Sequence, residues 1–278
     1  MSKARLLPPC GYQGGKRKIS RAIAAELMRG SAGRVYDFCT GSGAVSLSLI
    51  EAGLPAHSLT LVDSGPWGQF WQMLLSDRLD LDLMQATANE LQAMDPLKVA
   101  AWLQGLAWTW QPPEHWLWLQ AGTFGRLPVW WDGSRWRCGS HSCQRSYHAA
   151  GHWSAPDGSR AAPTLASPAR IMQRIGAARS ALDGAQALHC AVEAVIVEPG
   201  SVVYVDPDYQ GTPGYSASLP LEALLPTWLE AGCDVYCSEQ TVRLEPDEVI
   251  EMGQRQASGL RGVSKRQDSE KLLIWRAQ

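Results

Sequence analysis

The sequence DPDY, at residues 206–209, follows directly on the apolar segment VVYV and brings together groups that suit chemistry at an amino nitrogen. A strand that ended there would present the carboxylate of Asp206, the carbonyl of Pro207 and the ring of Tyr209 at its carboxyl end, where open α/β sheets bind ligands. The two oxygens can accept the N–H groups of an amine on a planar ring and favour a tetrahedral nitrogen as it attacks. The aromatic ring can stack on the same group if it is a base flipped out of a duplex.

A glycine-rich turn, DFCTGSG at residues 37–43, follows a second apolar segment. Gly41 and Gly43 let the backbone turn tightly and approach a ligand closely. Asp63 lies 22 residues after Gly41, the distance at which nucleotide-type cofactor sites place a carboxylate on a ribose hydroxyl pair. A simpler interpretation, in which the glycines shape a loop and Asp63 caps a helix, stays open on this pattern alone.

The elements that must position these motifs alternate between strands and helices. Residues 17–29 predict an amphipathic helix that Gly30 ends, and a further helix runs from the glycine turn to Gly53. Further helices are expected at residues 168–183 and 219–232, and strands at 34–38, 58–62, 189–197, 201–205, 235–239 and 271–275. This alternation indicates an α/β fold with a mostly parallel sheet.

The middle of the chain has a different composition, which predicts an insertion. Eight of the 13 tryptophans lie between Trp102 and Trp136, against three phenylalanines in the whole chain. Helices are expected to about Leu119, followed by an irregular tract rich in Trp, Gly, Ser, Arg and His. Residues 72–160 are therefore expected to form a separate inserted domain.

Three motifs, in this order, resemble those of the Dam-type DNA adenine-N6 methyltransferases and their phage relatives. GYQGGK (11–16) is similar to the family's Y-x-G-G-K element, DFCTGSG to its D-x-F-x-G-x-G cofactor loop, and DPDY to its D-P-P-Y catalytic signature. WLWLQAGTFG (116–125) resembles a weaker element before the family's target-recognition hairpin. With VYCSE (235–239) and SEKL (269–272), the likeness extends over nearly the whole chain.

The resemblance implies a Rossmann-like methyltransferase sheet that transfers the methyl group of S-adenosyl-L-methionine to adenine N6 of a base flipped from double-stranded DNA. Residues 1–71 and 161–278 would form the catalytic domain, and residues 72–160 the target-recognition domain. The catalytic set would be Asp206, Pro207 and Tyr209. The residues bordering the cofactor would be Tyr12, Gly14, Lys16, Asp37, Phe38, Gly41, Gly43 and Asp63. A bacterial cell or a phage-infected host is the expected setting.

Two departures from the family pattern leave alternatives open. Asp208 stands where the family has a second proline, which adds a carboxylate beside the catalytic one and raises the alternative of a catalytically impaired DNA-binding homologue. The acid that relatives often carry before the catalytic strand is matched by neither Glu193 nor Glu198 with assurance. Transfer to cytosine N4 is the nearest enzymatic alternative, since the same acceptors serve any exocyclic amine. Methylation of RNA or of a protein amide is a third.

Arginines interleave with aromatic residues in the irregular tract, a pattern that suits phosphate contact, base-edge hydrogen bonding and wedging between base steps. We expect Trp102 to Trp118 to be mostly core and residues 125–145 to face DNA. The DNA-binding candidates are Arg126, Arg135, Arg137 and Arg145. The spacing of Cys138, Cys143, His148 and His152 could hold zinc, but it is not one of the usual tight pairs, so no metal site is assigned.

Composition limits the remaining possibilities. The chain has 278 residues, a formal net charge of −2 and 45% hydrophobic residues, and its seven scattered cysteines argue against a secreted disulfide framework. No run approaches the roughly 18 apolar residues of a membrane span, and the first nine residues lack a signal-peptide core, so we expect a cytoplasmic protein without membrane contact. The near-neutral charge neither supports nor excludes DNA, because positive charge can gather on one face.

Overall fold

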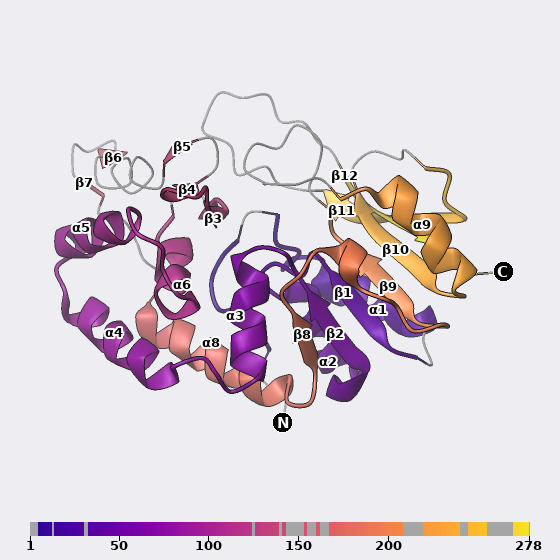
Figure 1. Ribbon diagram of the computed structural model, residues 1–278, viewed down its shortest axis with the longest axis horizontal. Helices are drawn as coiled ribbons and strands as arrows, with labels where there is room; N and C mark the ends of the chain where they lie inside the picture. The colour runs from indigo at the N-terminus through magenta and orange to yellow at the C-terminus, as the bar shows by residue number, and fades with distance from the viewer. Residues whose placement is uncertain are drawn as a thin grey trace.

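A computed structural model shows an α/β protein built on one large sheet (Figure 1). The residues it describes are 5–12, 14–30, 33–123, 126–138, 141–142, 153–154, 160–161, 167–207, 219–239, 244–254 and 269–277. Among them, no helix is long and apolar enough to cross a membrane.

The large sheet has seven strands in the order β11-β12-β10-β9-β1-β2-β8. The five strands from β10 to β8 pair in parallel, and β12 is antiparallel to both of its neighbours. The bounds are β1 Val35–Phe38, β2 Leu59–Val62, β8 Gln186–Leu188, β9 Val202–Val205, β10 Asp234–Glu239, β11 Glu248–Gln254 and β12 Ser269–Trp275. A mostly parallel sheet confirms the expected fold class and is compatible with a Rossmann-like fold.

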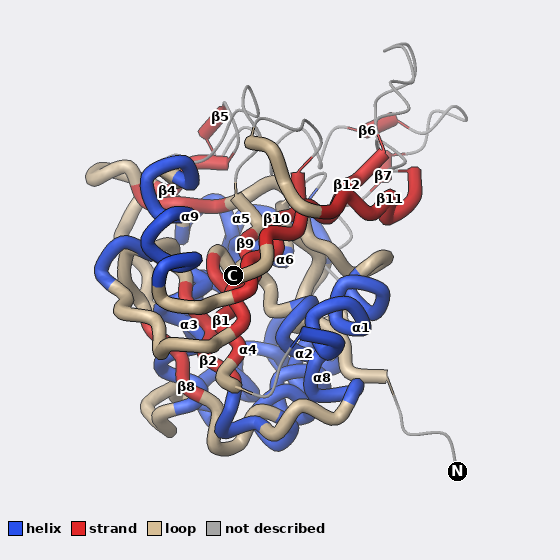
Figure 2. The backbone as a smooth tube through the Cα atoms, turned by 90° about the vertical axis from the view of Figure 1, so that its right-hand side faces the viewer, coloured by secondary structure: helices blue, strands red, loops and turns tan. Residues whose placement is uncertain are grey.

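Both faces of the sheet are buried at its centre, since every residue of β1, β2 and β9 is buried and successive side chains point to opposite sides. Val35 and Val202 belong to one hydrophobic cluster, and Phe38 and Val203 to the other. Figure 2 views the molecule from the β11 and β12 end and shows α1, α2 and α8 on one side and α9 on the other. The bounds of the surrounding helices are α1 Ser20–Gly30, α2 Ala44–Ala52, the 3-10 helix η1 Ala56–Ser58, α3 Pro66–Leu75, α8 Pro168–Ala181 and α9 Leu221–Glu230.

The strand expected at residues 189–197 is wrong. The edge strand β8 ends at Leu188, and residues 192–194 form the short 3-10 helix η3 instead. The chain must cross here from the outer edge of the sheet to β9, on the far side of β1, so it runs over a face of the sheet. Val192 and Val197 are buried in this crossing while Ile196 is 93% exposed. The β-branched residues therefore serve the crossing and not a strand.

The middle segment packs onto the rest of the molecule through aromatic residues. It contains α4 Leu81–Ala93, α5 Pro96–Leu106, α6 Pro113–Ala121, the small sheet β3 Val129–Trp131, β4 Trp136–Cys138 and β5 His141–Ser142, and the pair β6 Trp153–Ser154 and β7 Arg160–Ala161. The ring of Trp116 meets that of Trp67, in α3, edge to face at 5.1 Å, and their cluster of buried residues extends to the large sheet. The segment thus shares a core with the sheet helices, and its division from them at residues 72 and 160 stays a prediction.

The tryptophans of this segment divide differently from the sequence expectation. Trp116 and Trp118 are buried as expected, but Trp108 and Trp110 are 49% and 53% exposed. Trp136, expected to face DNA, is 3% exposed, and its Nε1 donates to the carbonyl of Thr109. The hairpin therefore uses this ring to attach itself to the segment that follows α5.

Candidate functional site

The two motifs lie side by side where the strand order of the large sheet reverses. From β1 the chain continues outward to β2 and β8, then returns to β9 on the other side of β1. Phe38 pairs with Val205 in register, and the backbone N–H of Asp206 donates to the carbonyl of Phe38 at 3.3 Å. The carboxyl ends of β1 and β9 thus bring residues 37–43 next to Asp206 and Pro207, at the point where open α/β sheets bind ligands.

The glycine turn after β1 has a backbone that only glycine adopts without strain. Gly41 and Gly43 have φ values of 51° and 77°. A Cβ on Gly43 would lie 2.7 Å from Cζ2 of Trp71, and one on Gly41 would lie 3.2 Å from Cε1 of Tyr12. The indole N–H of Trp71 donates to the carbonyl of Gly41 at 2.8 Å. Trp71 therefore fixes the turn through this hydrogen bond and through its packing against Gly43. The position of Trp71 in an aromatic helix did not predict this role.

Asp37 stabilises this turn from inside the protein. It is 1% exposed, and its Oδ2 accepts hydrogen bonds from the backbone N–H, at 3.1 Å, and from the hydroxyl of Ser46 in the first turn of α2. Burial raises the pKa of the Asp37 carboxyl to about 7, with the Asp206 charge adding to the rise and the Ser46 hydrogen bonds opposing it. Asp37 thus ties β1 to the first turn of α2 and orders the cofactor candidate loop between them.

Asp63, at the end of β2, joins the turn to α3. Its Oδ2 accepts from the N–H of Gly41 at 2.9 Å, and its Oδ1 accepts from the N–H of Gly65 at 2.7 Å. Burial raises the pKa of Asp63 despite these hydrogen bonds. Each carboxylate oxygen can accept a second hydrogen bond, so the arrangement is compatible with a ribose hydroxyl pair as well as with the helix-capping interpretation.

Lys16 connects the amino-terminal motif to the catalytic candidate. Its Nζ lies 2.6 Å from Oδ1 of Asp206 and 2.9 Å from Oε1 of Glu270, and both Lys16 and Glu270 are 5% exposed. Burial disfavours the ammonium, but the two carboxylates outweigh it and raise the pKa of Lys16. The structure thus places Lys16 beside Asp206. Glu270 is a residue that we missed, and the SEKL segment was the available signal.

The remaining candidates divide between the described and undescribed parts of the chain. Pro207 is buried directly after Asp206. Asp208 and Tyr209 lie outside the described residues. Glu198 forms an ion pair with Arg34 at 2.9 Å. Both residues precede their strands, so the pair lies at the amino ends of β1 and β9, whereas the candidate site lies at the carboxyl ends. His189 was not predicted, and its Nε2 lies 3.1 Å from the carbonyl of Ser64, next to Asp63.

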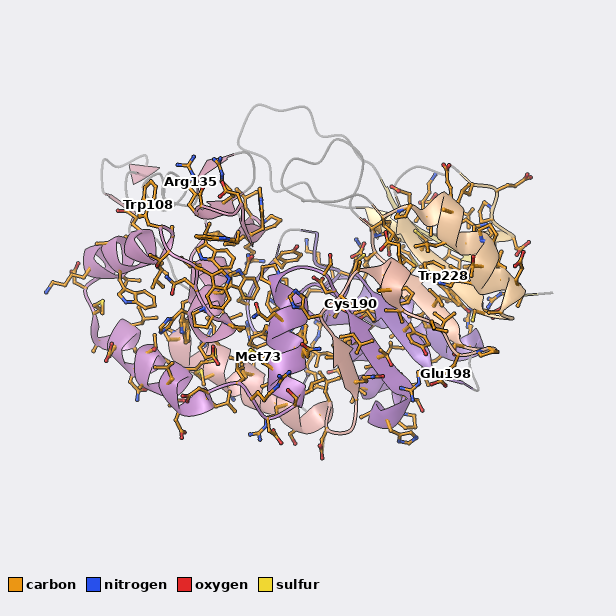
Figure 3. All side chains as sticks on the ribbon, in the orientation of Figure 1. Met73, Trp108, Arg135, Cys190, Glu198 and Trp228 are labelled. Atoms are coloured by element: carbon orange, nitrogen blue, oxygen red, sulfur yellow. The ribbon has the colours of Figure 1, made fainter. Side chains whose placement is uncertain are left out.

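The DNA-binding candidates have unequal surroundings. The Nε atoms of Arg137 and Arg135 lie 2.5 and 4.0 Å from Oδ2 of Asp132. Figure 3 shows Arg135 beside Trp108, and the guanidinium carbon lies 5.8 Å from the centre of the indole ring. Arg126 lies instead against the amino-terminal segment, and Arg145 is outside the described residues. The positive charge of the hairpin is thus partly neutralised within the hairpin itself.

The four residues whose spacing could hold zinc lie mostly outside the described part of the chain. Cys138 is fully buried, while Cys143, His148 and His152 lie outside the part of the chain that the structure describes. Within that part, no group of three or more His, Cys, Asp or Glu residues could hold a metal ion.

Comparisons with known proteins assign no family to this chain. No protein-family model matches the sequence, and no curated protein does so.

Proposed function

We propose that this chain is an S-adenosyl-L-methionine-dependent DNA methyltransferase that acts on adenine N6. The observation that carries the proposal is the adjacency of the glycine turn and Asp206 at the reversal of strand order, fixed by the hydrogen bond from Asp206 to Phe38. These are the two motifs whose sequences resemble the cofactor loop and the catalytic signature of the Dam-type enzymes.

The residues at the carboxyl end of β1 fit the cofactor chemically. The left-handed backbone at Gly41 and Gly43 lets a ligand approach closely, and Asp63 keeps acceptor capacity for hydroxyl groups. The carboxylates of Asp63 and Asp206 would favour a bound cation. When bound, S-adenosyl-L-methionine would supply an electrophilic methyl group on a sulfonium centre.

Asp206 and Pro207 would position the acceptor amine. The lone pair of an exocyclic amine is delocalised into the base, so acceptors for its N–H groups favour the tetrahedral nitrogen that attacks. The Nζ of Lys16, 2.6 Å from Oδ1 of Asp206, would hold this carboxylate in place as an acceptor for the amine. Lys16 and Glu270 would therefore act as positioning residues.

Transfer of labelled methyl from S-adenosyl-L-methionine to unmethylated duplex DNA, followed by nucleoside analysis, tests this proposal. We expect N6-methyladenine, and a loss of at least 100-fold in Asp206→Ala, the order of magnitude expected when a catalytic acceptor is removed. Asp82→Ala, at an exposed aspartate in α4, is the matched control and should retain full activity. N4-methylcytosine would instead support the alternative base.

Absence of any methyl transfer, with S-adenosyl-L-methionine still bound, would contradict the proposed activity and favour the impaired homologue. Asp208→Pro then separates the causes. Recovery of transfer would assign the impairment to Asp208, whereas continued inactivity would point to an acceptor other than DNA.

A further inference from the structure

Four arginines from three separate parts of the chain gather beside the amino-terminal segment. Arg5 and Arg17 flank that segment, Arg126 follows α6, and Arg174 lies in α8. The side chain of Arg5 donates to the carbonyl of Arg17 at 2.9 Å. Partial burial first, and then the nearby charges of Arg174, Arg5 and Arg126, lower the pKa of Arg17. We call these residues the arginine cluster.

Arg126 is held in the cluster by the backbone. Its φ of 61° lies in the left-handed region, which is unusual for a residue other than glycine. Its side chain lies on Gly11, where a Cβ would be 2.4 Å from Cδ and 2.6 Å from Nε of the arginine. Cys10, which precedes Gly11, is buried. Burial raises the pKa of its thiol, and the charges of Arg174 and Arg126 both oppose that rise. The missing side chain at position 11 thus provides the space that Arg126 occupies.

Within the described part of the chain, the cluster lacks the ion pairs that two nearby arginines have. Among the described residues, none of its four members forms an ion pair, although Arg21 pairs with Glu51 and Arg179 with Asp77 at 3.0 and 2.6 Å. Arg21 and Arg179 lie in α1 and α8, close in sequence to Arg17 and Arg174. Glu51 is close enough for the charge of Arg5 to lower its pKa, but within the described residues its ion pair is with Arg21.

We propose that the arginine cluster binds the phosphodiester backbone of nucleic acid. Like charges held together repel, and a bound anion relieves that repulsion. The planar guanidinium group matches phosphate oxygens with paired hydrogen bonds, which an ammonium group does not. Three of the four side chains are exposed, so the charges can meet a polymer that lies along the surface.

The cluster adjoins the candidate site. Gly11, on which Arg126 lies, directly precedes Tyr12, whose ring lies close to Gly41 in the glycine turn. Figure 2 shows α1, α2 and α8 together on the side of the molecule where the amino terminus lies. A nucleic-acid strand bound to the arginine cluster would run from the inserted segment toward the part of the protein that holds the candidate site. This assignment of duplex DNA as the ligand rests on the proposed function.

Salt-dependent binding of a fluorescent duplex to the full-length protein tests the cluster without any need for catalysis. The logarithm of affinity falls with the logarithm of salt concentration in proportion to the number of phosphates neutralised. Arg17→Gln with Arg174→Gln should make that slope about 2 smaller, since each lost phosphate contact reduces it by roughly 1. Binding at about 0.15 M salt should also weaken. Arg21→Gln with Arg179→Gln, the matched control, should leave the slope unchanged.

An unchanged slope in the cluster variant, or an equal change in both variants, would overturn the proposal. Thermal stabilisation by inorganic phosphate that depends on Arg17 and Arg174, without duplex binding, would overturn the nucleic-acid assignment in favour of a small anion. Duplex binding that needs the cluster in a protein without methyl transfer would uphold the cluster while the proposed activity failed.

Discussion

Lys16 and Arg17 are neighbours in the sequence, yet the fold places their positive charges in opposite surroundings. Lys16 is 5% exposed and contacts two carboxylates. Arg17 is exposed and lies among three other arginines. The partners of Lys16 are Asp206, directly after β9, and Glu270, in β12, whereas the arginines around Arg17 come from the amino-terminal segment, the middle segment and α8. The role of each charge thus depends on residues far along the chain.

Removing the compensated charge should have the largest effect. Lys16→Met would leave the carboxylates of Asp206 and Glu270 without their cation, and breaking a buried ion pair in this way costs about 3–5 kcal/mol of unfolding free energy. Denaturant unfolding measures the loss. Adding Glu270→Gln should restore part of it, and Lys18→Met, at an exposed site, should change stability by about 0.5 kcal/mol or less. A small loss of unfolding free energy in Lys16→Met would show that Asp206 and Glu270 do not need this cation.

Asp37 offers a third environment, a buried acid that forms no ion pair among the described residues. Its pKa, about 7, lies above the unfolded value, so the folded state binds more protons between about pH 4 and pH 7, and stability falls as pH rises through that window. Asp37→Asn removes this contribution. As the pH rises from 5 to 8, the variant should gain about 2–3 kcal/mol of stability relative to the natural protein, because only the natural protein loses this contribution. A difference that did not change with pH would contradict the raised pKa.

Relieving the uncompensated charges should have the smallest effect on stability, and one of opposite sign. In the absence of DNA, Arg17→Gln with Arg174→Gln should raise the unfolding free energy by a few tenths of a kcal/mol at low salt, and the gain should vanish at high salt. Arg21→Gln should instead lower it slightly, because Arg21 loses its ion pair with Glu51. A marked loss in the cluster variant would show that these arginines serve packing and not ligand binding.

Local sequence signals predicted much of the fold. As expected, α2 begins after Gly43 and ends at Gly53. Both glycines adopt the left-handed backbone conformation, which stops a helix from continuing. The apolar segments at residues 35–38 and 202–205 became the two central strands of the sheet, since both of their faces are buried. Residues 189–197 defeated the same reasoning. Their β-branched composition suits a strand, but the order of the sheet requires a crossing at that place.

The candidate site was predictable only in part. The glycine turn and the carboxylate of Asp206 follow from the rule that ligand-binding residues sit at the carboxyl ends of parallel strands, which a sequence reveals once its strands are recognised. The exposure of Trp108, the burial of Trp136 and the pairing of Arg137 with Asp132 do not follow from composition. The exposure and burial of the two rings depend on how the hairpin packs against residues 107–109 and α6, whereas the ion pair forms within the hairpin.

The sequence by itself determined the alternation of strands and helices, the two motifs and their order, because these depend on local periodicity and backbone preference. The tertiary structure decided the surroundings of the charges near the candidate site. Lys16 meets Glu270 only because β12 lies next to β10 in the sheet, and Arg126 meets Gly11 only because the middle segment packs back onto the amino-terminal segment. Electrostatic interactions act through space at a few ångströms, so distance along the chain does not predict them.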